Sequence, residues 1–207
     1  MSAVIPSLYL ASQSPRRREL LRQIGVRHAV IQASIPEQAA PGETAMDYVR
    51  RLAQEKAAAG YAQLIAQALP LAPVLGADTL GLLDGHILEK PLDKNHAQAM
   101  LRQLSGRTHQ VITAVALYTA ERQSLRISTT YVTFRELTDG EISAYWETGE
   151  PQDKAGSYAI QGLGAVFVKE IRGSYSGVVG LPIEATCELL REFAVPWWTP
   201  LDAEQNP

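Results

Sequence analysis

A serine- and arginine-rich segment early in the chain has the residue types that bind phosphate. Residues 12–18 read Ser-Gln-Ser-Pro-Arg-Arg-Arg and follow an apolar stretch, residues 8–11. Ser14 followed by Pro15 predicts that a helix begins here. A helix N-terminus offers free N–H groups and a positive dipole end, and guanidinium groups add bidentate donors. Because arginines in a first turn oppose the dipole, a bound anion would offset a cost. A solvated basic turn on a surface helix is the alternative.

A carboxylate after an apolar strand gives a second candidate group. Residues 73–77 predict a buried strand that ends at Asp78 and Thr79. A carboxylate at such a strand end can serve as a base or a metal ligand, and a loop-capping aspartate is the alternative. Glu37 lies in a proline-containing loop and is equally ambiguous. Three separated lysines could bind phosphate, although each is also typical of a solvated surface: Lys56, Lys90 and Lys154.

A glycine-rich stretch completes the candidates. Residues 157–164 contain Gly162 and Gly164 in a Gly-x-Gly pattern, a weak signal that lets backbone approach a ligand closely. The four histidines lack metal-ligand spacing, and Cys187 lies on the apolar side of a predicted helix. The sequence contains no Walker A motif and no Rossmann fingerprint. A phosphate-binding carboxylate enzyme is the enzymatic function that these motifs leave open.

Hydrophobic periodicity predicts the elements that must position these groups. Asp84-Gly85 predicts a hairpin turn, Asp93 a helix cap, and Thr138 with Glu141 a capping box. Helices are predicted over residues 15–24, 44–59, 93–104, 138–146 and 182–193. Strands are predicted over residues 8–11, 29–32, 73–77, 80–83, 86–88, 111–119, 126–134 and 164–171. The pattern indicates an α/β fold with a mixed, twisted sheet.

Composition limits the class of protein. The 207 residues are 46% hydrophobic and 20% charged, which suits one large domain or two small lobes. A net charge of −3 argues against broad nucleic-acid coating, and one cysteine excludes an intrachain disulfide. No apolar run approaches the ~18–20 residues that span a bilayer, and residues 1–6 show no secretory signal. We therefore expect a cytoplasmic protein without membrane association.

Six motifs occur in an order that closely resembles the Maf family of nucleotide pyrophosphatases. They are Leu-Tyr-Leu-Ala-Ser-Gln-Ser-Pro-Arg-Arg (8–17), Glu-Lys-Ala (55–57), Gly-Ala-Asp-Thr (76–79), Leu-Glu-Lys-Pro (88–91), Leu-Ser-Gly (104–106) and Asp-Lys-Ala-Gly (153–156). The resemblance implies a single Maf-like domain over residues 1–207, with a core of residues 7–194 and a C-terminal tail of residues 195–207. It also implies the fold of the inosine triphosphate pyrophosphatases, whose mixed sheet and flanking helices form two lobes around a cleft, and a homodimer.

The same resemblance implies hydrolysis of a nucleoside triphosphate between its α- and β-phosphates, with a divalent cation (Mg²⁺ or Mn²⁺). Asp78 matches the catalytic carboxylate, which would orient or deprotonate the attacking water directly or through the metal. Glu37 matches an acidic position associated with that metal. Four residues match polar positions near the triphosphate, where they would neutralise charge on the leaving pyrophosphate: Ser12, Arg17, Lys56 and Lys90.

Three positions resemble the branch of the family that acts on dTTP and UTP: Arg16, Thr79 and Gln161. A branch that acts on 7-methyl-GTP instead has Trp at the position of Arg16 and Glu at that of Gln161. A glutamine amide can donate to a uracil carbonyl and accept from the ring N3–H, whereas a carboxylate only accepts. Thymine and uracil share this edge, so the sequence does not separate dTTP from UTP.

The leading hypothesis is a house-cleaning pyrophosphatase that removes excess or modified pyrimidine triphosphates. The alternative is a non-catalytic nucleotide-binding regulator of septum formation, which could bind nucleic acid through its arginine cluster. Net acidity and one short basic turn argue against stable nucleic-acid binding. A third hypothesis is a purine-directed pyrophosphatase of the same fold.

Overall fold

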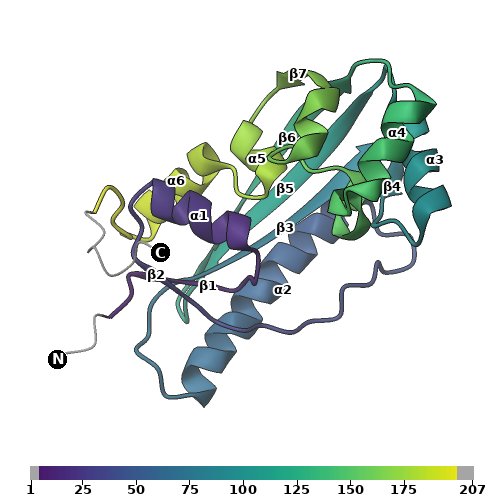
Figure 1. The fold of residues 1–207 in the computed structure, drawn as a ribbon. Helices are drawn as coiled ribbons and strands as arrows, with labels where there is room; N and C mark the ends of the chain where they lie inside the picture. The colour runs from purple at the N-terminus through teal and green to yellow at the C-terminus, as the bar shows by residue number, and fades with distance from the viewer. Residues whose placement is uncertain (1–4, 200–207) are drawn as a thin grey trace. The chain divides into compact units, whose positions relative to one another are not determined.

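The computed structural model describes residues 5–199, and the described chain forms a seven-stranded mixed sheet flanked by helices (Figure 1). The strands are β1 (Leu8–Leu10), β2 (His28–Val30), β3 (Val74–Leu83), β4 (His86–Leu88), β5 (Thr108–Tyr118), β6 (Gln123–Phe134) and β7 (Val168–Arg172). The α-helices are α1 (Pro15–Gln23), α2 (Ala45–Ala66), α3 (Lys94–Leu104), α4 (Asp139–Glu147), α5 (Tyr175–Val179) and α6 (Ile183–Glu192). The 3₁₀ segments of the described chain are η1 (Glu150–Asp153), η2 (Ala155–Ser157) and η3 (Leu163–Phe167).

The strand order is β2-β1-β3-β5-β6-β7, and β4 pairs with β3. β1 runs parallel to β2 and β3, whereas the β3–β4 and β6–β7 pairs are antiparallel. The predicted α/β class with a mixed sheet is therefore confirmed. Among residues 5–199, no helix is long and apolar enough to cross a membrane.

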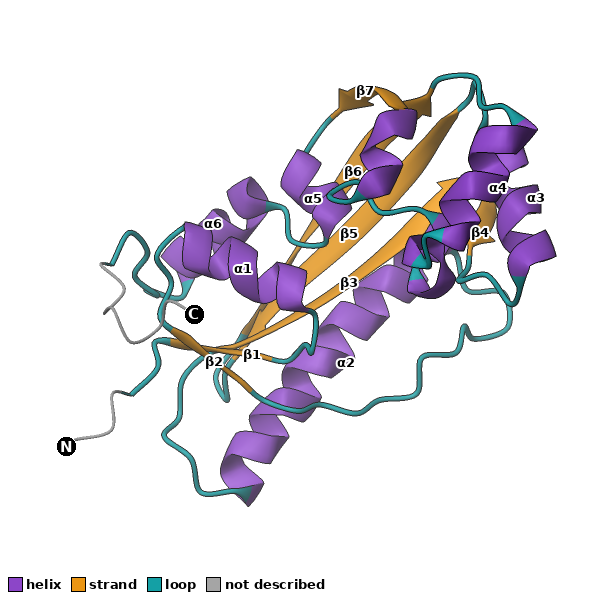
Figure 2. Cartoon of the chain, in the orientation of Figure 1, coloured by secondary structure: helices purple, strands orange, loops and turns teal. Residues whose placement is uncertain are grey.

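The described chain divides into two compact units, and β3, β5 and β6, drawn in orange in Figure 2, each contribute residues to both. Within the described residues, the first unit comprises residues 5–78, 113–127 and 180–199. The second comprises residues 79–112 and 128–179. The predicted cleft, and the division into a core of residues 7–194 and a tail of residues 195–207, stay predictions; residues 200–207 lie outside the described part.

In the first unit, α2 packs against β1 and β3. The helix continues to Ala66, beyond its predicted end at residue 59, and Gly60 lies inside it. A Cβ atom on Gly60 would lie 2.8 Å from Val74 Cγ1 and 2.9 Å from the Ala11 Cβ atom, so glycine is what allows the helix to approach the sheet. A buried cluster fills this contact: Tyr9, Ala11, Ile31, Tyr61, Leu64 and Val74.

The predicted strand break at Asp78 and Thr79 is wrong, because β3 runs through both residues. A carboxylate is tolerated inside this strand because Lys56 Nζ lies 2.7 Å from Asp78 Oδ1. The predicted hairpin turn after β3 is confirmed. Asp84 and Gly85 have φ angles of 50° and 80°, the left-handed pair that a type I′ hairpin turn requires.

Side-chain caps begin two helices of the second unit as predicted. The Asp93 carboxylate accepts from His96 N at the start of α3, and Thr138 forms a reciprocal capping box with Glu141 at the start of α4. The predicted strand over residues 164–171 is wrong in its first half, where the chain forms η3 before β7 begins.

An aromatic cluster in the core of the second unit includes a buried histidine, His109. His109 is 2% exposed, packs edge-on against Phe134 and Tyr158, and lies 2.8 Å from the Tyr158 hydroxyl through Nε2. Burial lowers the pKa of His109 to about 4. In the unfolded chain His109 is therefore protonated near pH 6.5, whereas in the folded chain it is protonated only near pH 4.

We expect this difference to make the protein acid-sensitive. Stability contributed by neutral His109 is full above pH 6.5 and falls as pH decreases toward 4. At pH 5 the loss is about 2 kcal/mol, at ~1.4 kcal/mol per pH unit. His109→Gln keeps a polar partner for Tyr158 and should show a shallower fall in unfolding free energy between pH 7 and 5, measured by urea titration. Parallel pH profiles for the two proteins would contradict this assignment.

Candidate active site

The N-terminus of α1 holds Ser12 and Arg17 together. The helix begins at Pro15 as predicted, and Ser14 has the extended backbone of an N-cap, although its side chain makes no capping hydrogen bond. Ser14 N instead donates to Ser12 Oγ at 3.2 Å. Arg17 Nη1 donates to the same oxygen at 3.1 Å, and Arg17 Nε donates to Gly180 O at 2.8 Å. The guanidinium is thus fixed at the helix end where an anion binds best.

Lys56 joins two carboxylates that lie far apart in the sequence. Its Nζ atom lies 2.7 Å from Glu37 Oε1 and 2.7 Å from Asp78 Oδ1. The Lys56 and Asp78 side chains are 12% and 13% exposed, whereas Glu37 is 57% exposed. The arrangement therefore has a sheltered Asp–Lys pair and an outer carboxylate that is open to a ligand.

Burial sets the electrostatics of this cluster. It raises the pKa of the Asp78 carboxyl, an effect that the positive charges of Lys56 and Arg17 oppose only in part and that Glu37 reinforces. Burial also lowers the pKa of the Arg17 guanidinium, with a smaller contribution from the neighbouring charge of Arg16. A carboxylate with a raised pKa is a stronger base than an ordinary aspartate, which suits proton abstraction.

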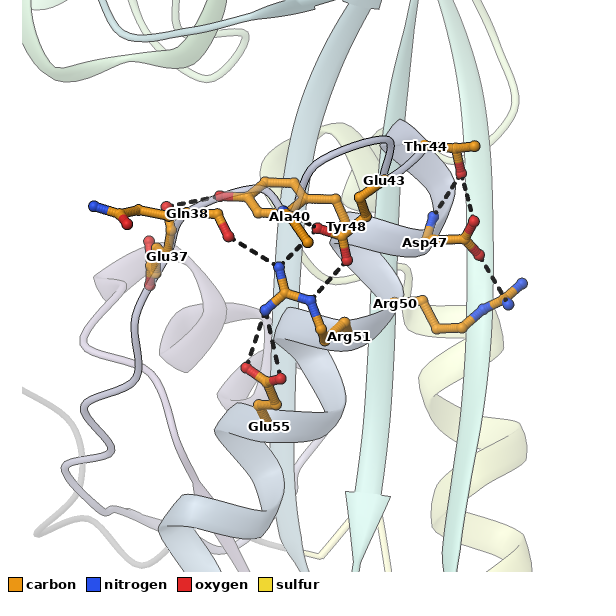
Figure 3. A network of polar contacts seen from close by, with 10 residues as sticks. All are labelled: Glu37, Gln38, Ala40, Glu43, Thr44, Asp47, Tyr48, Arg50, Arg51 and Glu55. Atoms are coloured by element: carbon orange, nitrogen blue, oxygen red, sulfur yellow. Dashed lines mark hydrogen bonds and ion pairs between the residues drawn. The ribbon is translucent and has the colours of Figure 1, made fainter.

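Arg51 holds the loop that carries Glu37 against α2 (Figure 3). Its guanidinium forms a bidentate pair with Glu43 at 2.7 and 2.8 Å and donates to Gln38 O at 3.0 Å. It also donates to Glu55, one helical turn further along α2. The hydrogen bonds from Arg51 are the main reason that the pKa of Glu43 is lowered to about 2, so this pair keeps its charges at any physiological pH.

Two further contacts fix the same loop. The Tyr48 hydroxyl donates to Glu37 O at 2.9 Å, and Ala40 N donates to Glu43 Oε2 at 2.9 Å (Figure 3). No sequence motif marks this network. Its one local signal is the i,i+4 spacing of Arg51 and Glu55, which is common on solvated helices.

Five of the residues predicted for the site therefore meet in the first unit: Ser12, Arg17, Glu37, Lys56 and Asp78. Arg16 follows Pro15 in the first turn of α1. In the second unit, Thr79 lies half-buried in β3, Lys90 is exposed after β4, and Gln161 is exposed between η2 and η3. The positions of these three relative to the first unit stay a prediction.

Comparison with known proteins places the chain in a family. The sequence model described as Maf-like protein matches residues 7–193. A dTTP/UTP pyrophosphatase of Saccharophagus degradans is 56% identical over 92% of this chain and 90% of its own length. Proteins with the same name from Shigella sonnei and Escherichia coli O157:H7 are 58% and 56% identical, each over 90% of this chain and 93% of their own length. With this identity extending over nearly all of its length, the chain belongs to the Maf family.

Proposed function

We propose that this protein is a nucleoside triphosphate pyrophosphatase that hydrolyses dTTP and UTP, and modified forms of them, to the monophosphate and pyrophosphate. The observation that carries the proposal is the contact of Lys56 with both Glu37 and Asp78, beside the Ser12–Arg17 pair. The names of the relatives, which are at least 56% identical, support the same substrates. By family resemblance, its role would be to remove excess or modified pyrimidine nucleotides.

Asp78 is the residue that would accept a proton from the attacking water. Its raised pKa makes it a better acceptor than a solvated aspartate, and Lys56 holds the carboxylate in place. Arg17 and Lys56 would neutralise negative charge that develops on the leaving pyrophosphate. The free N–H groups at the start of α1 would bind phosphate oxygens beside them.

Glu37 and Asp78 are the side chains that would hold a divalent cation, Mg²⁺ or Mn²⁺. Both carboxylates converge on one positive group, Lys56 Nζ, so their oxygens are placed to share a cation. Mg²⁺ is commonly bound by one or two carboxylates together with substrate phosphates, and this pair fits that pattern. When bound, the cation would polarise the phosphoryl oxygens and balance the charge of the triphosphate.

Arg16, Thr79 and Gln161 are proposed to select the base, as their resemblance to the dTTP/UTP branch implies. The Gln161 amide would donate to a carbonyl of uracil or thymine and accept from N3–H. Lys90 would join the phosphate contacts. A homodimer in the cytoplasm completes the proposal; light scattering during size-exclusion chromatography tests the dimer.

A substrate panel tests the proposed function. Purified protein with Mg²⁺ or Mn²⁺ should release pyrophosphate from dTTP and UTP faster than from CTP, ITP, XTP or 7-methyl-GTP. Gln161→Glu should lower kcat/KM for dTTP and UTP roughly tenfold or more, because the carboxylate cannot donate to the base. Absence of turnover by the wild type would refute the proposal. Faster turnover of ITP or XTP would favour a purine-directed enzyme, and an unchanged base preference would refute the role of Gln161.

A non-catalytic regulator of septum formation is the less favoured function. Such a protein has no need for a buried base beside a lysine and an arginine, and the net charge of −3 gives no general affinity for nucleic acid. A regulator that needs no hydrolysis should keep its cellular effect in the Asp78→Asn variant. Loss of that effect would link it to catalysis.

A further inference from the structure

The loop that carries Gln161, residues 158–164, is fixed on both sides of that residue by one pair of side chains. On its C-terminal side, Gly164 N donates to Glu150 Oε1 and Leu163 N donates to Glu150 Oε2, each at 2.9 Å. On its N-terminal side, Ala159 N donates to the Tyr145 hydroxyl at 3.2 Å. We call residues 158–164 the Gln161 loop.

The Glu150 carboxylate and the Tyr145 hydroxyl are themselves joined. Tyr145 Oη donates to Glu150 Oε1 at 2.6 Å, so a continuous chain of hydrogen bonds connects the two sides of the loop. The Tyr145 ring is 5% exposed and packs edge-on against Phe167 at 4.9 Å, which anchors the chain in the core of the second unit. Burial alone would raise the pKa of Glu150, but the hydrogen bonds from Tyr145, Gly164 and Leu163 together lower it.

The loop is shaped to fit this carboxylate. A Cβ atom on Gly162 would lie 2.0 Å from Glu150 Oε2, so only glycine allows the carboxylate to reach the two N–H groups beyond it. Those same hydrogen bonds satisfy the first two N–H groups of η3, whose residues 164–167 the sequence predicted to be strand. The backbone on both sides of Gln161 therefore depends on Glu150.

We propose that Glu150 is a positioning residue for base selection: it fixes the Gln161 loop so that the Gln161 amide meets the edge of the pyrimidine. The inference rests on the proposed function, because it requires that Gln161 reads the base. It adds a residue that does not touch the nucleotide and acts through the backbone of the loop. Tyr145 is the second positioning residue, because its hydroxyl joins Glu150 to Ala159 N.

Glu150→Gln is the direct test. The amide of the new side chain presents N–H donors toward backbone N–H groups. At least one of the hydrogen bonds that Glu150 accepts from Leu163 N and Gly164 N is therefore lost. CTP is the informative competitor, because its base has the size of uracil but reverses the donor and acceptor groups at positions 3 and 4. We expect the ratio of kcat/KM for UTP to that for CTP to fall about tenfold, mainly through a higher KM for UTP. Glu147→Gln, the same change at a 67% exposed position of α4, should leave the ratio unchanged.

A double-mutant cycle separates positioning from a general structural role. If Glu150 acts through Gln161, Glu150→Gln should cause no further loss of the UTP/CTP ratio in a Gln161→Ala background. Tyr145→Phe, which removes the hydroxyl and keeps the ring, should lower the ratio in the same direction and serves if Glu150→Gln does not fold. A wild type without UTP turnover would refute the proposed function itself. An unchanged ratio in folded, active Glu150→Gln and Tyr145→Phe proteins would refute only the role of Glu150.

Discussion

Asp78→Asn should lower kcat for dTTP and UTP by roughly 10²–10⁴-fold, the range that a positioned general base contributes. In the wild type, Lys56 Nζ lies 2.7 Å from Asp78 Oδ1. Asparagine keeps the size of the side chain and an oxygen that this ammonium group can still contact. It cannot take a proton from water. The loss should therefore appear in kcat rather than in the KM for nucleotide, measured as pyrophosphate release with the divalent cation at saturation.

Asp139→Asn provides the matched control. Asp139 carries the same functional group, is 77% exposed and pairs with Arg102 on the protein surface. Its replacement should leave kcat within a factor of two of wild type. Full turnover by the Asp78→Asn protein, or an equal loss in both variants, would mean that Asp78 is not the base.

Gly76→Ala should destabilise the protein by about 3 kcal/mol or more, toward the upper end for overpacked cores. A Cβ atom on Gly76 would lie 2.3 Å from Ala53 O and 2.5 Å from Ala57 N. Both are backbone atoms of α2, so no side-chain rotation relieves the clash. Because Ala57 follows Lys56, the displaced helix should also pull the ammonium away from Asp78 and lower kcat. Urea unfolding and dTTP turnover measure the two effects.

Gly140→Ala makes the same chemical change where there is room for it. The nearest atom to a Cβ on Gly140, Thr138 Oγ1, is 4.0 Å away, and Gly140 lies in α4. We expect a small gain in unfolding free energy, on the order of 0.5 kcal/mol, because alanine favours a helix over the unfolded chain. Similar stabilities for the two variants would show that α2 can move away from β3 at little cost.

Features of the fold that depend on neighbouring residues could be predicted from the sequence. The caps at Asp93 and Thr138 and the Asp84-Gly85 turn involve partners within three residues, so their chemistry is visible in a short window. The class of fold follows from the alternation of such elements. Features that depend on distant partners could not be predicted in this way.

Three errors share this cause. β3 continues through Asp78 because Lys56, 22 residues earlier, neutralises the carboxylate. α2 continues through Gly60, where the sheet beneath the helix leaves no room for a Cβ atom. Residues 163–167 form a 3₁₀ segment whose first two N–H groups are capped by Glu150, 13 residues before Leu163. In each case the deciding partner is remote in sequence.

The site itself was predicted through family resemblance rather than from chemistry alone. Taken singly, Asp78 is better explained by a capping role and Lys56 by a solvated surface, and Glu37 is ambiguous. The structure adds what the motifs lack, namely that one ammonium group contacts both carboxylates. Arg51 and Glu150 were missed because they act on backbone, and no motif marks such residues.

The Arg51 network has a consequence for the entropy of nucleotide binding. An unanchored loop must lose backbone freedom when ligand arrives, at about 1–2 kcal/mol for each residue that becomes ordered. Here the contacts of Arg51 with Glu43 and Gln38, and of Tyr48 with Glu37, order the loop when the chain folds. The conformational penalty thus falls on folding rather than on association, and the outer carboxylate is preorganised before any nucleotide reaches it.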